Sequence, residues 1–251
     1  VAVWNRGITP AEILDIYNAA AAPYYERVLN RSPVRYWRLG ESAGPTAVDE
    51  TGNQDGTYVG TPTFSVTGAI VGDTDTAITT ALGNYVNVGT RPTAIGQLST
   101  FSLEAWIKTT DVTNAIISDF TGSAGFHLGL DSLGDIDLYL SNTWITNNIY
   151  MKWATTLTVN DGEWHHVILT HDGTGTAAGI TLFIDGVIAD VAPTVTYDNL
   201  VAAVPAGIDM LIGRHGAGVA GYEFVGSIDE VAIYPDELTS TEVADLYASG
   251  T

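Results

Sequence analysis

The alternation of apolar and polar residues predicts short β-strands along most of the chain after Val34. Successive side chains of a strand point to opposite faces, so this alternation is typical of strands with one buried face. The clearest runs are Tyr85–Val88, Phe101–Ile107, Trp164–Leu169 and Thr181–Ile184. Turn dipeptides such as Asp161-Gly162 and Asp185-Gly186 separate them. Many short strands with regular turns predict an all-β, two-sheet sandwich or barrel, with a helix only near Ser240–Ala248.

The two ends of the chain carry similar sequences. Residues 1–20, VAVWNRGITPAEILDIYNAA, align without a gap with residues 231–250, VAIYPDELTSTEVADLYASG, at an offset of 230. The matched pairs are Val1/Val231, Ala2/Ala232, Trp4/Tyr234, Thr9/Thr239, Glu12/Glu242, Asp15/Asp245 and Tyr17/Tyr247. Each segment predicts a short strand, a turn, and a helix that begins with a Thr–Glu capping box. We therefore expect an internal repeat, in which residues 1–20 are the closing strand and helix of a preceding module.

Residues 21–33 are predicted to link that segment to a complete module at 34–251. The alanine run Ala19–Ala22 can extend the first helix, and Pro23 limits it. The segment Tyr24–Leu29 has helical spacing and ends before Ser32-Pro33. A partly helical linker acts as a semi-rigid spacer rather than a loose tether.

The charge of the chain restricts its partners. Nine Lys and Arg residues face 29 Asp and Glu residues, which gives a formal net charge of −20. Such a surface repels phosphate groups, so nucleic acid and anionic lipid are disfavoured. No apolar run approaches the roughly 20 residues that span a bilayer, so membrane insertion is not expected. The chain has no cysteine, which excludes disulfides and thiolate metal sites. The acidic surface suits divalent cations, or it simply keeps the protein soluble.

Six sequence motifs follow one another in a fixed order between residues 35 and 234. They are RYWRLGE (35–41), VDETGNQDGTY (48–58), FSLEAWI (101–107), DGEWHHV (161–167), LFIDG (182–186) and FVGSIDEVAIY (224–234). Together they resemble the laminin-G-like modules of the concanavalin-A-like lectin and glucanase superfamily, as found in phage virion proteins and bacterial secreted proteins. The resemblance implies a two-sheet antiparallel jelly-roll sandwich with a short C-terminal helix.

The loop after the first motif is a candidate calcium site. Calcium prefers six to eight oxygen ligands from carboxylates, amides and carbonyls. Asp49, Asn53 and Asp55 supply such oxygens, and the resemblance adds Asp229 from the closing strand. A structural calcium ion there would tie the loop to the last strand. The alternative is a turn in which these side chains cap their own backbone.

A second candidate site lies in the variable segment 141–158. Sugars bind through their apolar faces on aromatic rings, while amides bind the hydroxyl groups. Trp144, Asn147, Asn148 and Tyr150 offer both kinds of group, with His127 and Trp153 nearby in the sequence. The alternative is that Tyr150 and Trp153 fill core or edge positions. The loop Arg214–Gly216 with Tyr222 is a weaker candidate.

The remaining candidates favour structure over chemistry. His165 and His166 are adjacent on a predicted strand and point to opposite faces, so they do not form one metal site by themselves. Glycosidases need paired carboxylates, and related glucanases carry E-x-D-x-E or E-x-D-x-x-E on one strand. The nearest segments, 135–139 and 227–230, lack the flanking glutamates, and Glu104 stands alone on its strand. We therefore expect a module that is not an enzyme.

These observations favour a lectin-like binding or adhesion module of a multi-module surface protein. The expected partners are a glycan or another cell-surface ligand, the neighbouring module in the same chain, and virion proteins. The resemblance implies an extracellular or virion-surface location, with a phage tail, fibre or capsid-appended protein as the leading hypothesis. Two alternatives stay open: a purely structural decoration or spacer domain, and an accessory carbohydrate-binding module of a secreted glycoside hydrolase.

Overall fold

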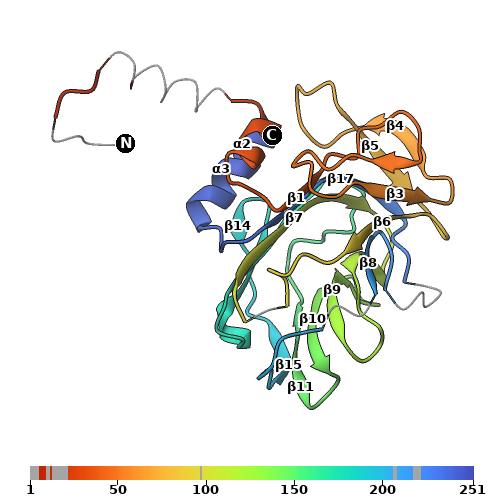
Figure 1. Ribbon diagram of the computed structural model, residues 1–251, viewed down its shortest axis with the longest axis vertical. Helices are drawn as coiled ribbons and strands as arrows, with labels where there is room; N and C mark the ends of the chain where they lie inside the picture. The colour runs from red at the N-terminus through yellow and green to blue at the C-terminus, as the bar shows by residue number, and fades with distance from the viewer. Residues whose placement is uncertain (1–5, 10–11, 13–21, 97, 206–207, 217–221) are drawn as a thin grey trace.

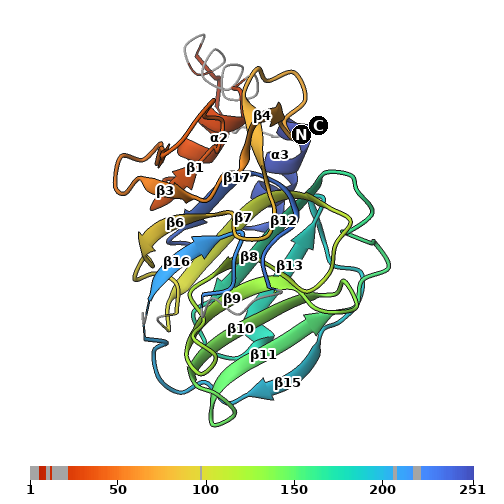
Figure 2. The ribbon, with the colours of Figure 1, turned by 90° about the vertical axis from the view of Figure 1, so that its right-hand side faces the viewer.

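The computed structural model describes residues 6–9, 12, 22–96, 98–205, 208–216 and 222–251. Within this part of the chain, two antiparallel sheets pack face to face as a sandwich (Figures 1 and 2). The predicted all-β jelly-roll sandwich with a short C-terminal helix is therefore confirmed. No helix in the described residues is long and apolar enough to cross a membrane.

The strands of each sheet follow one another in space in an order unlike their order in the chain. The eight-stranded sheet runs β14 (Val187–Ile188), β13 (Ile180–Ile184), β12 (His165–Asp172), β7 (Thr100–Thr109), β17 (Gly226–Tyr234), β5 (Thr76–Thr80) and β4 (Thr63–Thr67), with β1 (Arg35–Trp37) also paired to β17. The nine-stranded sheet runs β15 (Thr194–Asp198), β11 (Asn147–Trp153), β10 (Ile136–Thr143), β9 (Gly125–Leu130), β8 (Asn114–Ser118), β16 (Asp209–Ile212), β6 (Tyr85–Thr90), β3 (Gly56–Val59) and β2 (Thr46–Ala47). A single-turn 3-10 helix, η1 (Ala177–Gly179), precedes β13.

The main core lies between the two sheets. Strand β9 sends Phe126, Leu128 and Leu130 into it, and the next residues along the strand point to the opposite face. Burying one such side chain contributes about 1.5–3 kcal/mol relative to leaving it exposed. The same alternation in β10 and β11 sets which side chains face outward, and these are the ones that build the site described below.

A second core lies on the outer face of the eight-stranded sheet, beneath two helices. Strand β7 shows why its residues are buried on both faces: Leu103 and Ile107 enter the main core, while Glu104 and Trp106 point toward the helices. The covering helices are α2 (Tyr24–Leu29) and α3 (Ser240–Gly250). Figure 1 shows them side by side at one end of the molecule.

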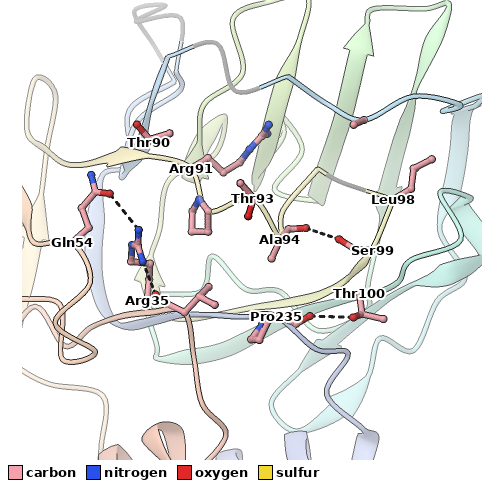
Figure 3. Close-up of a pocket in the computed structure, with 13 residues that line it drawn as sticks. Arg35, Gln54, Thr90, Arg91, Thr93, Ala94, Leu98, Ser99, Thr100 and Pro235 are labelled. Atoms are coloured by element: carbon pink, nitrogen blue, oxygen red, sulfur yellow. Dashed lines mark hydrogen bonds between the residues drawn. The ribbon is translucent and has the colours of Figure 1, made fainter.

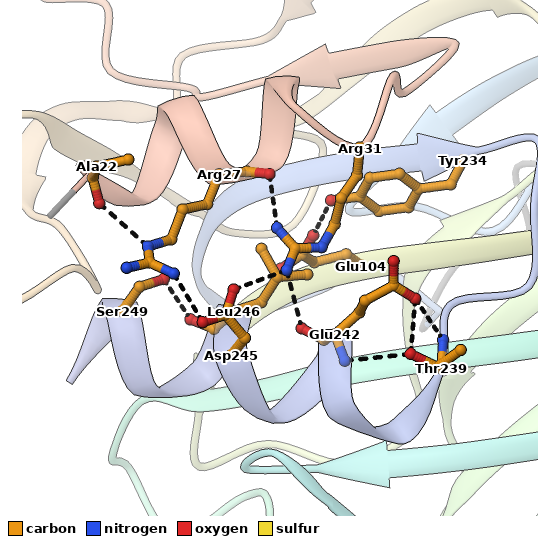
Figure 4. A network of polar contacts seen from close by, with 10 residues as sticks. All are labelled: Ala22, Arg27, Arg31, Glu104, Tyr234, Thr239, Glu242, Asp245, Leu246 and Ser249. Atoms are coloured by element: carbon orange, nitrogen blue, oxygen red, sulfur yellow. Dashed lines mark hydrogen bonds and ion pairs between the residues drawn. The ribbon is translucent and has the colours of Figure 1, made fainter. Parts of the chain in front are cut away.

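Ion pairs and caps fix these helices. Arg27 of α2 and Arg31, in the turn that follows this helix, both reach the carboxylate of Asp245 on α3, each at 2.7 Å (Figure 4). Helix α3 begins with the predicted capping box, in which Thr239 and Glu242 exchange hydrogen bonds with each other's backbone. The side chains of Tyr24 and Val28 in α2 are fully buried against the sheet.

The structure describes residues 22–33 of the linker that the sequence predicts. The predicted linker is helical at Tyr24–Leu29, but it packs into the second core instead of standing away from the sandwich as a spacer. The reason is its two buried side chains, Tyr24 and Val28, which find a matching apolar surface on β7 and β12. Most of the predicted segment of a preceding module, residues 1–5, 10–11 and 13–20, lies outside the described residues.

Candidate functional site

The outer face of the nine-stranded sheet carries a group of aromatic side chains. Because Leu138 and Leu140 of β10 point into the main core, Tyr139 between them points outward. Tyr150 of β11 lies between the core residues Ile149 and Met151 and points outward by the same rule. The strand register then sets three tyrosines in a row, because Tyr139 pairs with Tyr150, and Tyr150 with Tyr197 of β15.

These rings form a continuous path across four adjacent strands. The ring centroids of Tyr139 and Tyr150 are 4.7 Å apart, and those of Tyr150 and Tyr197 are 6.5 Å apart. On the other side, Tyr139 stacks on His127 of β9 at 4.9 Å. Trp144, in the β10–β11 hairpin, lies 5.2 Å from Tyr139 and 5.8 Å from Tyr150.

The path continues beyond β9 into two loops. His215 lies 5.3 Å from His127, and Tyr222 lies 5.4 Å from His215. Phe120 fills the space between His215 and Trp144, at 5.5 and 5.4 Å. We call this set the aromatic face. It consists of Phe120, His127, Tyr139, Trp144, Tyr150, Tyr197, His215 and Tyr222.

The aromatic face is accessible from outside. Tyr139, Trp144, Tyr150 and Tyr197 are half-buried, and Tyr222 is 39% exposed. In Figure 2 the strands that carry most of it, β9, β10, β11 and β15, lie at the end of the molecule away from α2 and α3. Half-buried rings on a sheet face present flat apolar surfaces with polar edges, which is the chemistry that holds a sugar ring.

Polar groups beneath the rings hold them in place. The Tyr139 hydroxyl donates to Asp137 at 2.7 Å, and Nε2 of His127 lies 3.2 Å from the same carboxyl group. Burial raises the pKa of Tyr139 above its ordinary value, helped by the charge of Asp137. Burial, together with the neighbouring His127 ring, lowers the pKa of His215 to about 4, so His215 is neutral at pH 7.

The positive charge beside Tyr150 is already paired. The ammonium group of Lys152 lies 5.6 Å from the centroid of Tyr150 and 2.6 Å from a carboxylate oxygen of Asp131. The hydrogen bond to Asp131 raises the pKa of Lys152, so it stays charged and bound to that partner. The aromatic face therefore offers stacking and hydrogen bonds more than a free cation.

Two of the four ligand-binding residues predicted from the sequence, Trp144 and Tyr150, meet in this face. Of the other two, Asn147 accepts from the backbone N–H of Val201 at 2.7 Å through its amide oxygen, and Asn148 is fully buried. A binding role for Asn147 and Asn148 stays a prediction. Trp153 lies in the main core, which is the alternative to a binding role that the sequence left open for it.

Sequence reasoning missed Tyr139, Tyr197 and Phe120. The polar–apolar alternation of 136–141 could have placed Tyr139 on the outer face, because Leu138 and Leu140 flank it. Tyr197 and Phe120 come from distant parts of the chain, and only the strand pairing and loop packing bring them close.

The residues of the predicted calcium site are engaged in hydrogen bonds to the backbone. One carboxylate oxygen of Asp49 accepts from the backbone N–H of Tyr36 at 2.9 Å and of Thr51 at 3.0 Å, and the other accepts from Gln54 at 2.9 Å. Asp55 accepts from the backbone N–H of Asp49 at 2.9 Å. This is the capped turn that the sequence left open as the alternative.

Asn53 and Asp229 do not complete an oxygen cage around Asp49. The amide nitrogen of Asn53 donates to the carbonyl oxygen of Val34 at 3.1 Å. Asp229 is buried in β17 and accepts from the backbone of Ala69 at 2.8 Å. In the described residues, no three His, Asp or Glu side chains are grouped so as to hold a metal ion. As they stand, these side chains fit the capped turn better than calcium, and calcium binding here stays a prediction.

The adjacent histidines serve two separate structural contacts. His166 stacks on Trp106 at 4.7 Å and lies 2.6 Å from Glu104 beneath the helices. His165 points to the other face and contacts Asp185 at 2.9 Å. Glu104 is fully buried and also accepts from the hydroxyls of Tyr24 and Tyr234, so its oxygens are used by the second core.

A cavity of about 940 Å³ lies beside the end of β6 and the start of β7 (Figure 3). Its polar lining is mostly paired within the protein: Arg35 donates to Gln54 at 3.3 Å, and Thr100 donates to the carbonyl of Pro235 at 3.0 Å. Arg91 forms an ion pair with the buried Asp119 at 3.1 Å. The cavity has few free groups for orienting a ligand, so the aromatic face is the stronger candidate site.

Comparison with known proteins places the chain among carbohydrate-related folds. Residues 79–244 match the family model described as the concanavalin A-like lectin/glucanases superfamily. A curated relative from Rattus norvegicus, the sushi, von Willebrand factor type A, EGF and pentraxin domain-containing protein 1, is 28% identical over 155 residues. The match covers 57% of this chain and only 4% of that protein.

Three solved structures of similar fold are two toxin binding domains and one domain of an arabinanase. The binding domain of botulinum neurotoxin DC in complex with SialylT has a TM-score of 0.62 and 14% identity, over 89% of this chain and 52% of that one. The receptor binding domain of the botulinum neurotoxin C/D mosaic serotype has a TM-score of 0.61 and 15% identity, over 87% and 51%. Domain 4 of the GH43 extracellular arabinanase AbnA from Geobacillus stearothermophilus, in complex with arabinotriose, has a TM-score of 0.59 and 18% identity, over 86% and 98%.

Proposed function

Since this chain belongs to the concanavalin A-like lectin/glucanases superfamily, we propose that it is a non-catalytic module whose aromatic face binds a neutral glycan on a cell or polymer surface. The observation that carries the proposal is the unbroken row of half-buried rings from Tyr197 through Tyr150 and Tyr139 to His127. An extended sugar chain can lie along such a row and stack on several rings in turn.

The charge around the face supports a neutral ligand. Lys152 is held by Asp131 and His215 is neutral at pH 7, while the whole chain carries a net charge of −20. A sialylated or uronate-containing glycan would meet long-range repulsion, and Lys152, held by Asp131, does little to offset it. A neutral glycan avoids this cost.

The proposal places the module outside the cell, in a multi-module protein that adheres to its target. The similar chains are a toxin receptor-binding domain, a toxin binding domain in complex with SialylT, and a domain of an extracellular arabinanase. Weak sites on linked modules gain affinity through multivalency. A phage virion is the setting that the opening motif, RYWRLGE, suggests within this proposal.

A second candidate function is that of an accessory module that holds a glycoside hydrolase on its polymer. It is favoured by the similarity to domain 4 of the arabinanase, because the match covers 98% of that chain. Both functions use the same face, and they differ in what else the full-length protein carries.

Glycan-array binding tests the proposal. The wild-type chain is expected to retain neutral oligosaccharides, and Trp144→Ala and Tyr150→Ala are each expected to weaken that binding at least tenfold, or about 1.4 kcal/mol, as central aromatic contacts do. The matched control is Tyr25→Ala, because Tyr25 is a half-buried tyrosine on α2, away from the face. Absence of binding to every glycan, or equal loss in the control, would contradict the proposal.

A further inference from the structure

Helix α2 belongs to the sandwich as fully as helix α3 does. The Tyr24 hydroxyl donates to Glu104 at 2.6 Å and accepts from the indole nitrogen of Trp106 at 2.8 Å. Arg27 of the same helix and Arg31, in the turn after it, form ion pairs with Asp245 of α3. A module that began at Val34 would lack these contacts and would leave the second core partly uncovered.

The sequence match between the two ends follows the buried positions of the closing element. In residues 231–251, the buried apolar side chains are Val231, Ala232, Ile233, Tyr234, Leu238, Val243 and Leu246. At an offset of 230, the aligned residues are also all apolar: Val1, Ala2, Val3, Trp4, Ile8, Ile13 and Ile16. Some exposed positions differ, as the pairs Arg6/Asp236 and Gly7/Glu237 show, whereas the exposed Thr239 is matched by Thr9 because it caps the helix. A match that follows burial reflects the same packing requirement, not composition alone.

The described part of the first segment repeats one structural detail as well. The backbone N–H and the hydroxyl of Thr9 donate to Glu12 at 2.8 and 2.9 Å, and the backbone of Glu12 donates to Thr9 at 3.2 Å. The corresponding distances between Thr239 and Glu242 are 2.9, 2.7 and 3.3 Å. Residues 1–5, 10–11 and 13–21 lie outside the described part, so their match is one of sequence.

We propose that the repeating unit of this protein is residues 22–251, with α2 as its first element and α3 as its last, and that residues 1–21 duplicate the closing element of a preceding copy. The stretch from Tyr24, the first residue of α2, to Gly250, the last residue of α3, has 227 residues and fits within the offset of 230. The partner of segment 1–21 is thus a second copy of this unit. This proposal does not depend on glycan binding.

The proposal sets how successive copies are joined. Between the position equivalent to the end of α3, residue 20, and the start of α2, residue 24, only residues 21–23 remain, so these two positions are at most about 14 Å apart. A domain of this size has a radius of gyration of about 17 Å, so adjacent copies must touch. Pro23 and Ser249 line one cavity, which shows that the two ends of the unit lie close together.

The joints therefore lie at the helical end of each sandwich. Figures 1 and 2 place α2 and α3 at one end and β11 and β15 at the other. Successive copies would meet through their helical ends and leave the aromatic faces of all copies uncovered. Such an array holds its binding faces at fixed spacing without long linkers.

Two matched triple variants of the full chain test the assignment, since each changes aligned positions in one of the two segments. They are Ile8→Ser/Ile13→Ser/Ile16→Ser and Leu238→Ser/Val243→Ser/Leu246→Ser. The second triple removes core side chains and is expected to lower the Tm by more than about 10 °C or to abolish cooperative unfolding. The first triple is expected to leave the Tm within about 1 °C, because segment 1–21 serves another copy. A comparable drop in both triples would overturn the proposal, since segment 1–21 would then pack in its own chain.

An exchange of segments tests the duplication itself. In a full-length chimera, the sequence of residues 1–21 replaces residues 231–251, and a second version keeps tyrosine at position 234 so that Glu104 retains that hydroxyl donor. We expect at least the second version to unfold cooperatively and to keep the far-UV circular dichroism of the parent. Loss of cooperative unfolding in both versions would show that the first segment cannot close a sandwich, and would overturn the proposal.

Discussion

Removing the hydroxyl oxygen of Tyr24 tests whether α2 is an integral part of the domain. In Tyr24→Phe the ring stays buried, so the apolar packing is retained. Two hydrogen bonds disappear: the one donated to Glu104 at 2.6 Å and the one accepted from Trp106 at 2.8 Å. The change therefore isolates the polar contacts that tie α2 to strand β7.

The size of the effect follows from these two contacts. A hydrogen bond to a carboxylate contributes about 1.5–3 kcal/mol, and a buried donor left without its acceptor, here the indole N–H of Trp106, costs about 1–3 kcal/mol. Glu104 keeps His166 and the hydroxyl of Tyr234 as partners, which limits the loss. We expect a decrease of about 3 kcal/mol in the free energy of unfolding, or about 9 °C in Tm for a chain of this length.

Urea unfolding followed by tryptophan fluorescence measures this difference directly. The matched control is Tyr25→Phe, on the same helix, whose hydroxyl makes no hydrogen bond among the described contacts; it should change stability by less than about 0.5 kcal/mol. If Tyr24→Phe is as stable as the control, α2 does not dock as described, and the repeating unit would begin later in the chain.

Three further predictions concern the two candidate sites. In the folded state the pKa of His215 is about 4, below its ordinary value of about 6.5, so the stability contributed by the neutral ring is complete above pH 6.5 and is lost as the pH falls. Between pH 7.5 and pH 5, the free energy of unfolding in urea should fall by about 2 kcal/mol more for the wild type than for His215→Gln. Equal decreases in the two proteins would contradict this prediction. Asp131→Asn frees the ammonium of Lys152 beside the aromatic face, so binding of an anionic sugar should rise severalfold while binding of a neutral sugar stays the same; no change for either class would show that the ion pair does not set ligand charge. If Asp49 and its neighbours hold a calcium ion, EDTA should lower the Tm, and added calcium should restore it. An unchanged Tm in EDTA would count against a structural calcium ion.

Much of the fold could be predicted because its signals are local. The turn dipeptides and the alternation in segments such as 85–88 are set by neighbouring residues, and the Thr239–Glu242 capping box needs only four residues. The role of α2 could not be predicted in this way. Its contacts to Glu104 and Asp245 span about 80 and 218 positions, and a short helix beside an alanine run has the local pattern of a linker.

The candidate site could be predicted only in part, for the same reason. Trp144 and Tyr150 lie within one hairpin, so their proximity is visible in the sequence. Tyr197 reaches the same row through the pairing of β15 with β11, which sequence spacing does not reveal. Asp49 illustrates a different limit of sequence analysis. Its carboxylate is chemically suited to calcium, but only the structure shows that its oxygens already accept hydrogen bonds from backbone N–H groups.

Titration of the chain, labelled with carbon-13 in the tyrosine rings, against a neutral oligosaccharide selected on the array tests the central claim most directly. The account predicts shifts in the NMR signals of Tyr139, Tyr150 and Tyr197, which line the aromatic face, and none in those of Tyr24 and Tyr234, which are buried beneath the helices. Shifts confined to tyrosines outside the aromatic face, or no shift at saturating sugar, would contradict it.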